Sequence, residues 1–135
     1  MTFQQSEQFT RRLADTTVWL TTVSAKNRPA PRPVWFVFDG EQIIVFSRPD
    51  AVKVKHIESN PYVSLSFNTD DQGADVLVIS GRAEFDKSLV PSTAPGGYLA
   101  KYEPRYGVIG LDRETFDNTY SVGIRITPER SWSYV

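Results

Sequence analysis

The chain contains no cysteine and a single histidine, His56, among its 135 residues. Without cysteine it can form neither a disulfide framework nor a thiolate metal site, and one histidine cannot build a histidine-rich metal cluster. We therefore expect no metal site. We interpret His56 as an ordinary polar residue and assign it no catalytic role.

Several motifs of common enzyme classes are also missing. The sequence has neither the G-x-S-x-G pattern of serine hydrolases nor the G-x-x-x-x-G-K-[ST] pattern of phosphate-binding loops. No apolar run approaches the roughly 20 residues that span a bilayer, and the first five residues lack a signal-like segment. We expect a soluble cytoplasmic protein with no membrane partner, folded as one domain over residues 1–135.

The net charge of the chain is small, but its charges are unevenly distributed. The formal net charge is −1, yet residues 26–55 carry six basic side chains against three acidic ones. This pattern favours a small anionic ligand over a nucleic acid, which usually needs a broader basic face. The alternative is that these residues are solvated loop charges.

Proline is concentrated at one place. Pro29, Pro31 and Pro33 alternate and lead directly into the apolar and aromatic run at residues 34–38. Because proline has no backbone N–H, the segment is predicted to be a strand that cannot be paired on both sides. Such a strand beside aromatic side chains can receive a flat ligand, although an ordinary edge strand with a hydrophobic face would look the same.

The first half of the chain alternates between strand and helix patterns. The capping-box spacing of Thr2 and Gln5 predicts a helix over residues 3–14. Residues 18–24, 31–38 and 42–47 are predicted to form a three-strand antiparallel meander, with a turn at Asp39 and Gly40. A helix over 51–59, capped by Asp50, precedes a strand over 62–68.

The second half is predicted to contain one long strand over 75–86, bent at Gly81, and two strands over 119–127 and 131–134 around the turn at Pro128. Residues 91–110 are the least regular and are interpreted as a lid or a subunit contact with a short helix. Together these elements indicate an all-β fold with a few short helices, closed as an antiparallel barrel.

Four motifs resemble the pyridoxamine 5′-phosphate oxidase-like superfamily, in particular its probable F420-dependent reductases. They lie at residues 21–29, 33–40, 47–55 and 57–61, in the expected order and spacing. The resemblance implies a six-stranded antiparallel split β-barrel of the FMN-binding type. It also implies a homodimer with two cofactor sites along the subunit interface.

The resemblance also implies which residues bind the cofactor. The strand from Arg32 to Phe36 would run along the flavin-type ring, so that Pro33, Val34, Trp35 and Phe36 line it. The cofactor phosphate would lie at Ser47, Arg48, Lys53 and Lys55, with Lys53 in the place of the family's phosphate-binding lysine. Trp132 would approach the cofactor, in some members from the partner subunit. Core or interface packing is the alternative for Trp35 and Trp132.

We therefore expect an F420-dependent oxidoreductase that transfers a hydride between reduced F420 and a small unsaturated or conjugated substrate. Since the cofactor carries the reactive carbon, no protein nucleophile is needed, and no catalytic residue is assigned. The alternatives are an FMN-dependent oxidoreductase of the same superfamily and a non-catalytic carrier of flavin or haem. A nucleic-acid-binding barrel is a distant third hypothesis.

Overall fold

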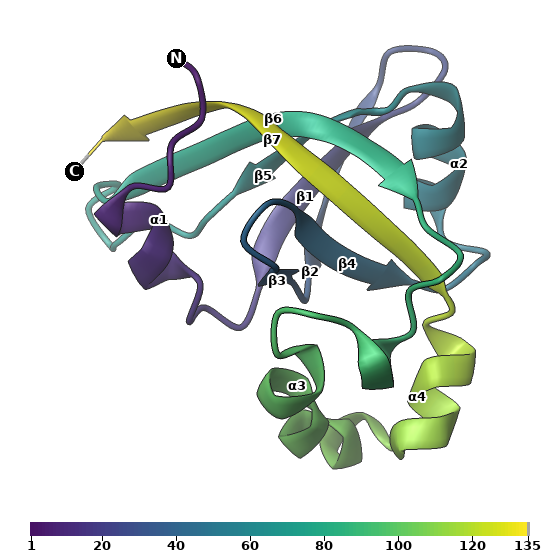
Figure 1. Cartoon of the computed structure of the whole chain (residues 1–135). Helices are drawn as coiled ribbons and strands as arrows, with labels where there is room; N and C mark the ends of the chain where they lie inside the picture. Colours follow the sequence, from purple (N-terminus) through teal and green to yellow (C-terminus); the bar gives the residue numbers. More distant parts are fainter. Residues whose placement is uncertain (135) are drawn as a thin grey trace.

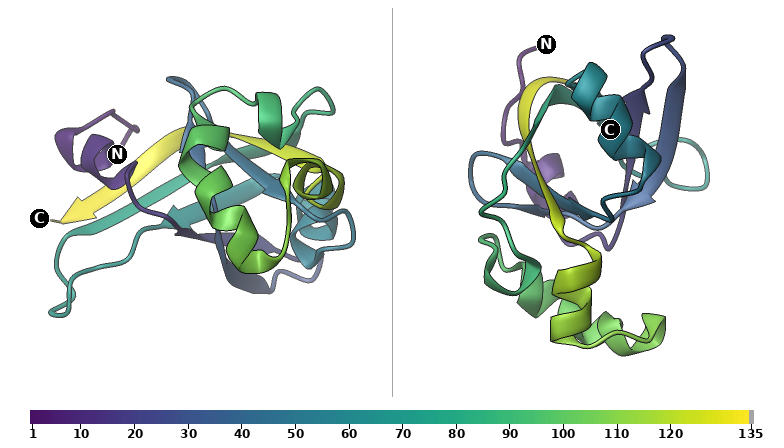
Figure 2. Two further views of the ribbon diagram at one scale, coloured as in Figure 1. Left: turned by 90° about the horizontal axis from the view of Figure 1, so that it is seen from below. Right: turned by 90° about the vertical axis from the view of Figure 1, so that its right-hand side faces the viewer.

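The sheet curls until its two ends meet. The computed structural model describes residues 1–134, and within them seven strands form one antiparallel sheet in the order β2-β1-β5-β6-β7-β4-β3. The strands are β1 (Val18–Val23), β2 (Pro29–Val34), β3 (Val37–Phe38), β4 (Ile43–Ser47), β5 (Tyr62–Ser66), β6 (Val76–Phe85) and β7 (Val122–Tyr134). The two end strands, β2 and β3, are joined only by Trp35 and Phe36, so the strands form a ring in the right view of Figure 2. The expected split-barrel fold is confirmed.

Short helices cover the ring. Helix α1 (Glu7–Arg12) and helix α2 (Val52–Ser59) lie at opposite ends of the barrel, while α3 (Tyr98–Tyr106) and α4 (Arg113–Thr119) lie together beside β4 (Figure 1). Single 3-10 turns, η1 (Pro91–Thr93) and η2 (Gly107–Ile109), flank α3. Within residues 1–134, no helix is both long enough and apolar enough to cross a bilayer.

Strand β4 explains why the molecule has two apolar clusters. All five of its residues are buried, as its uninterrupted apolar run indicates. Because neighbouring side chains of a strand point to opposite faces, Ile43 and Val45 fill the barrel interior while Ile44 and Phe46 pack under α3 and α4. The helical layer of α3 and α4 is thereby fixed to the outside of the barrel.

The predicted meander is wrong, because the strand expected over 31–38 is two strands. β2 pairs with β1 and β3 pairs with β4, at opposite ends of the sheet order. The chain leaves the first pair at Trp35 and enters the second at Val37, which raises the strand count from the expected six to seven. The predicted turn at Asp39 is confirmed, since its Oδ1 accepts the N–H groups of Glu41 and Gln42.

Both predicted helix caps are wrong. Ser6, not Thr2, caps α1 by accepting the N–H of Phe9, and Thr2 instead forms a bridge with Arg130. Helix α2 begins after Ala51, without a side-chain cap. The N-terminal residues therefore extend the sheet pairing instead of the helix.

The bend at Gly81 is confirmed, and it explains why the predicted turn at Pro128 does not form. The β6–β7 register shifts between Ser80 and Gly81, so that Ser80 faces Arg130 and Gly81 faces Pro128. A proline, which cannot donate to the ladder, is tolerated at such a bulge. The strands expected on either side of Pro128 are therefore one strand, and residues 119–121 belong to the end of α4 and the connection after it.

Candidate functional site

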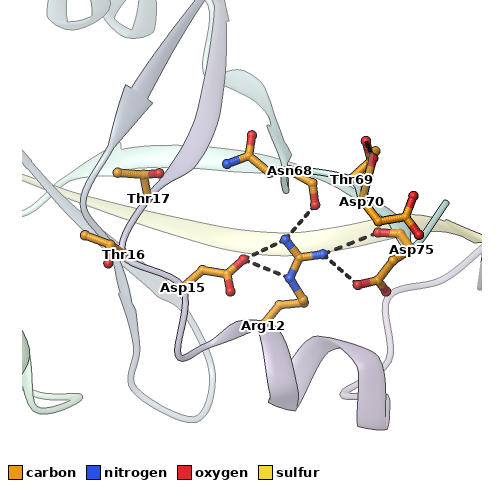
Figure 3. Close-up of a pocket in the computed structure, with 8 residues that line it drawn as sticks. All are labelled: Arg12, Asp15, Thr16, Thr17, Asn68, Thr69, Asp70 and Asp75. Atoms are coloured by element: carbon orange, nitrogen blue, oxygen red, sulfur yellow. Dashed lines mark hydrogen bonds and ion pairs between the residues drawn. The ribbon is translucent and has the colours of Figure 1, made fainter. Parts of the chain in front are cut away.

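A first hollow, of about 380 Å³, lies beside α1, and its charged side chains bond to one another. The Arg12 guanidinium, whose side chain is only 8% exposed, lies 2.7 Å from the carboxylate of Asp15 and 3.2 Å from that of Asp75 (Figure 3). It also donates to the backbone oxygen of Asn68 at 2.6 Å. Since these acceptors already occupy the donors of Arg12, the cluster ties α1 to the sheet and leaves no cation for a ligand.

A second hollow, which we call the aromatic pocket, lies between β2, β4 and the α3–α4 layer. Its volume is about 310 Å³. The walls are mainly aromatic and aliphatic, and they are Thr17, Pro33, Val34, Trp35, Phe46, Lys53, Tyr98, Ile109, Phe116 and Tyr120. A mostly apolar pocket with few polar groups is typical of sites for small organic ligands and cofactors.

A group of stacked rings lies on the α3–α4 side, and three of them, Trp35, Phe116 and Tyr120, line the pocket. Trp35 stacks on Tyr102 with ring centroids 4.6 Å apart, and Tyr106 stacks on Phe116 at 4.0 Å. Tyr120 stacks on Phe116 at 4.6 Å. Stacked aromatic pairs have a preferred geometry, so the stacking constrains the orientation of the rings that line the pocket.

A third hollow, the cationic hollow, lies between β2 and the start of α2 and has a volume of about 260 Å³. Its walls include the Arg32 and Lys53 side chains, and they are Leu20, Thr22, Ala30, Arg32, Pro33, Ala51, Val52 and Lys53. Pro33 and Lys53 also line the aromatic pocket. The two hollows are therefore neighbours that have these two residues in common.

Lys53 is a half-buried cation without an acidic partner. Its Nζ lies 3.4 Å from Ser47 Oγ, and within residues 1–134 neither Lys53 nor Arg32 forms an ion pair with a carboxylate. Burial, and secondarily the charge of Arg32, lower the pKa of Lys53. An anion placed here would offset the repulsion between the charges of Lys53 and Arg32. It would also face the N–H groups at the start of α2, which have no side-chain cap.

Strand β2 is an end strand, as its prolines predict. It pairs only with β1, and Pro29, Pro31 and Pro33 face Val23, Thr21 and Trp19. Because a proline has no N–H to exchange with β1, these three prolines take the positions whose carbonyl groups face the free edge. One of those carbonyl oxygens, on Pro31, accepts a hydrogen bond from the Arg32 guanidinium at 2.8 Å. The free edge of β2 thus offers acceptors to a ligand.

The structure brings together six of the ten residues predicted for the cofactor site. Pro33, Val34, Trp35 and Lys53 line the aromatic pocket, Arg32 lines the cationic hollow, and Ser47 contacts Lys53. Their assignment to a cofactor stays a prediction.

The other four residues lie elsewhere within this one chain. Phe36 is fully buried in the barrel interior, where its ring packs against Phe67. Arg48 is 61% exposed beside Asp50, and Lys55 is exposed on the outer side of α2. Trp132 is 62% exposed on the outer face of β7 and lines neither the aromatic pocket nor the cationic hollow.

The pocket residues of α4 were not predicted, although a signal for the helix exists. Asp112 and Thr115 form a capping box at its start, with Asp112 Oδ1 accepting the Thr115 N–H at 2.8 Å. Phe116 and Tyr120 follow four residues apart, which is the spacing of one helical face. This pattern identifies an amphipathic turn that can close a pocket.

Comparison with known proteins supports the fold and the family. Residues 5–133 match the family described as pyridoxamine 5′-phosphate oxidase. No curated protein matches the chain in sequence.

Three solved structures show the same fold at low sequence identity. The haem storage protein HutZ of Vibrio cholerae has a TM-score of 0.69 and 22% identity, with 95% of this chain and 94% of that chain covered. An F420 reductase has a TM-score of 0.68 and 24% identity, with 90% and 94% covered. A FAD-binding protein of Mesorhizobium loti has a TM-score of 0.62 and 19% identity, with 97% and 92% covered. With the curled sheet and the match over residues 5–133, the chain belongs to the pyridoxamine 5′-phosphate oxidase family of split barrels.

Proposed function

We propose that the protein is an F420-dependent oxidoreductase that transfers a hydride between reduced F420 and a small unsaturated or conjugated substrate. The observation that carries the proposal is that an apolar aromatic pocket and a hollow with two cations share the lining residues Pro33 and Lys53. Within residues 1–134, neither cation forms an ion pair with a carboxylate. A flavin-type cofactor needs both surfaces, because it joins a flat ring to an anionic tail.

The residues present fit such a group. Arg32 and Lys53 would hold the anionic tail, while Pro33, Val34 and Trp35 would support the ring. When bound, F420 supplies the hydride. The aromatic walls exclude water from that region, and the chain needs no nucleophile of its own.

Tyr98 lines the aromatic pocket, and we assign its hydroxyl the task of orienting a substrate there. Burial raises its pKa far above the usual tyrosine value. The hydroxyl is therefore protonated at every physiological pH and acts as a hydrogen-bond donor to a substrate oxygen. An acid with so high a pKa is a poor proton source, so we assign Tyr98 no role as the proton donor that follows hydride transfer.

The preference for F420 over FMN comes from the sequence resemblance. Two cations match the single phosphate of FMN as well as part of the longer acidic tail of F420, so FMN is the alternative cofactor. A haem carrier is less well supported, since His56 lines neither hollow and its Nδ1 lies 2.9 Å from Thr22 Oγ1.

We further propose that the protein is a homodimer with its sites at the interface. One row of paired residues crosses four neighbouring strands on the outer face of the sheet. Along β1, β5, β6 and β7 it consists of Trp19, Ser66, Val78 and Trp132, each directly opposite the next. Both tryptophans are substantially exposed, at 40% and 62%. Pro33 is opposite Trp19 on β2, which makes this face continuous with both hollows. A two-fold pairing would bury both tryptophans next to the site.

The decisive experiment compares two lysines of α2. Titration of the purified protein with F420 and with FMN, followed by fluorescence, gives the affinity for each cofactor. Lys53→Ala is expected to weaken binding about tenfold or more, because a sheltered charge pair at about 4 Å contributes between about 1 and 4 kcal/mol. Lys55→Ala removes the same charge from the exposed side of the helix and is expected to leave the affinity unchanged.

Equal affinities for the two variants would contradict the assignment of the anionic tail to Lys53. An assay of turnover then distinguishes an enzyme from a non-catalytic carrier. With reduced F420 and a panel of enones and quinones, an oxidoreductase accelerates oxidation of the cofactor, whereas a carrier binds it without acceleration. Binding of haem in place of either flavin would overturn the proposal.

A further inference from the structure

The break between β2 and β3 leaves a buried peptide segment without strand partners. Phe36 lies between the two strands and is fully buried. Its N–H and C=O groups would be unsatisfied unless another part of the chain bonded to them, and such groups are rare in folded proteins.

Two successive residues of α3 supply those partners. The N–H of Phe36 donates to the hydroxyl of Tyr102 at 2.8 Å, and the same hydroxyl lies 2.9 Å from the Phe36 carbonyl oxygen and 2.8 Å from that of Thr16. Lys101 Nζ donates to the carbonyl oxygens of Phe36 and Leu13, both at 3.0 Å. Side chains of a helix thus replace a missing strand at this point.

The same tyrosine also holds the residue before Phe36. The Tyr102 ring stacks on Trp35 with centroids 4.6 Å apart and planes 6° apart. Trp35 in turn is a wall of the aromatic pocket. One side chain therefore fixes both the backbone of the break and the indole that borders the pocket.

We propose that Tyr102, assisted by Lys101, is a positioning residue that sets the place of Trp35 and so the shape of the aromatic pocket. Neither side chain lines the pocket, so both act through Trp35. The effect on cofactor affinity rests on the proposed function, whereas the position of Trp35 can be measured without any ligand.

Tyr106 provides a matched control one turn along the same helix. Its ring is also parallel to Trp35, with centroids 6.4 Å apart, and it is just as buried. However, its hydroxyl has no hydrogen-bond partner among the described residues. The substitution Tyr106→Phe therefore removes a buried tyrosine hydroxyl but leaves the hydrogen bonds to Phe36 intact.

The test uses a protein in which Trp35 is the single tryptophan, made by Trp19→Phe and Trp132→Phe. In this background, Tyr102→Phe keeps the stacked ring and removes the hydroxyl. We expect a shifted Trp35 emission maximum and stronger quenching by acrylamide, while Tyr106→Phe leaves both unchanged. In the parent protein with all three tryptophans, Tyr102→Phe should lower the affinity for F420 or FMN about fivefold, because the displaced Trp35 supports the cofactor ring less well.

The proposal is overturned if Tyr102→Phe lowers the melting temperature but gives the same Trp35 emission and quenching as Tyr106→Phe, since the role would then be structural only. If Tyr102→Phe does not fold, Lys101→Met decides by the same measurements, because it removes the ammonium and retains most of the apolar stem. If the parent protein binds neither F420 nor FMN, the proposed function fails, and the Trp35 measurements still decide this inference.

Discussion

Gly81 shows how a single missing side chain shapes the barrel. A Cβ at this position would overlap the carbonyl oxygen of Thr127 on the neighbouring strand. We expect Gly81→Ala to lower the free energy of unfolding by about 1–3 kcal/mol or more, because the bulge must open to admit a methyl group. Urea denaturation followed by circular dichroism measures the loss.

The control for that substitution is Gly107→Ala. Gly107 has helical backbone angles, with φ −61° and ψ −31°, and a Cβ there meets no atom within 4 Å. The variant should be as stable as the parent or more stable by about 0.4–1 kcal/mol, because alanine restricts the unfolded chain. Equal losses at the two glycines would show that the approach of Thr127 does not limit position 81.

Helix α1 is too short to be stable alone, and charge fixes it to the sheet. It has six residues, and Gln8, Arg11 and Arg12 all donate to the Asp75 carboxylate. The hydrogen bond from Arg11, followed by that from Gln8, holds the pKa of Asp75 well below its usual range. A lowered folded-state pKa stabilises the fold above the ordinary carboxylate pKa of about 4, and this contribution is lost as the pH falls below that value.

We therefore expect amide protection in α1 to fall on acidification before protection in β5 and β6 does. Asp75→Asn should reduce the protection of α1 at neutral pH and flatten its pH dependence, as measured by hydrogen exchange. Asparagine suits the positive φ of 58° at this position, so the backbone is not strained further. Asp71→Asn, in the same exposed turn, is the control, and equal protection in the two variants would contradict this role of Asp75.

Most elements could be predicted because their patterns are local. The apolar run of β4 and the glycine bend of β6 are both visible in the sequence and both confirmed. The break at Trp35 and Phe36 could not be predicted, because the α3 side chains that satisfy it lie 65 residues or more along the chain. The turn predicted at Pro128 is wrong for a similar reason, because the bulge that accommodates this proline in β7 lies on the neighbouring strand, between Ser80 and Gly81.

At the scale of the whole molecule, the proximity of the candidate site residues follows from the resemblance more than from periodicity. The resemblance placed Phe36 beside Trp35 along the cofactor ring, although the side chain of Phe36 is buried in the barrel interior. The resemblance also assigned both Lys53 and Lys55 to the phosphate site, and of these two only Lys53 lines the hollows. The α3–α4 layer completes the pocket, and its position depends on packing against β4.

The outer face of the sheet carries the exposed side chains of Trp19 and Trp132. Ser66 lies at the centre of the row between them, directly opposite Trp19 and Val78. Ser66→Arg would place a charge in the proposed dimer interface, where an unpaired buried charge is costly, so the variant should sediment as a monomer. If the cofactor site is completed at that interface, this variant should also bind F420 or FMN more weakly than the parent. Gln72→Arg adds the same charge on an exposed turn and should change neither property. A Ser66→Arg protein with the parent's mass in solution would refute the proposed interface.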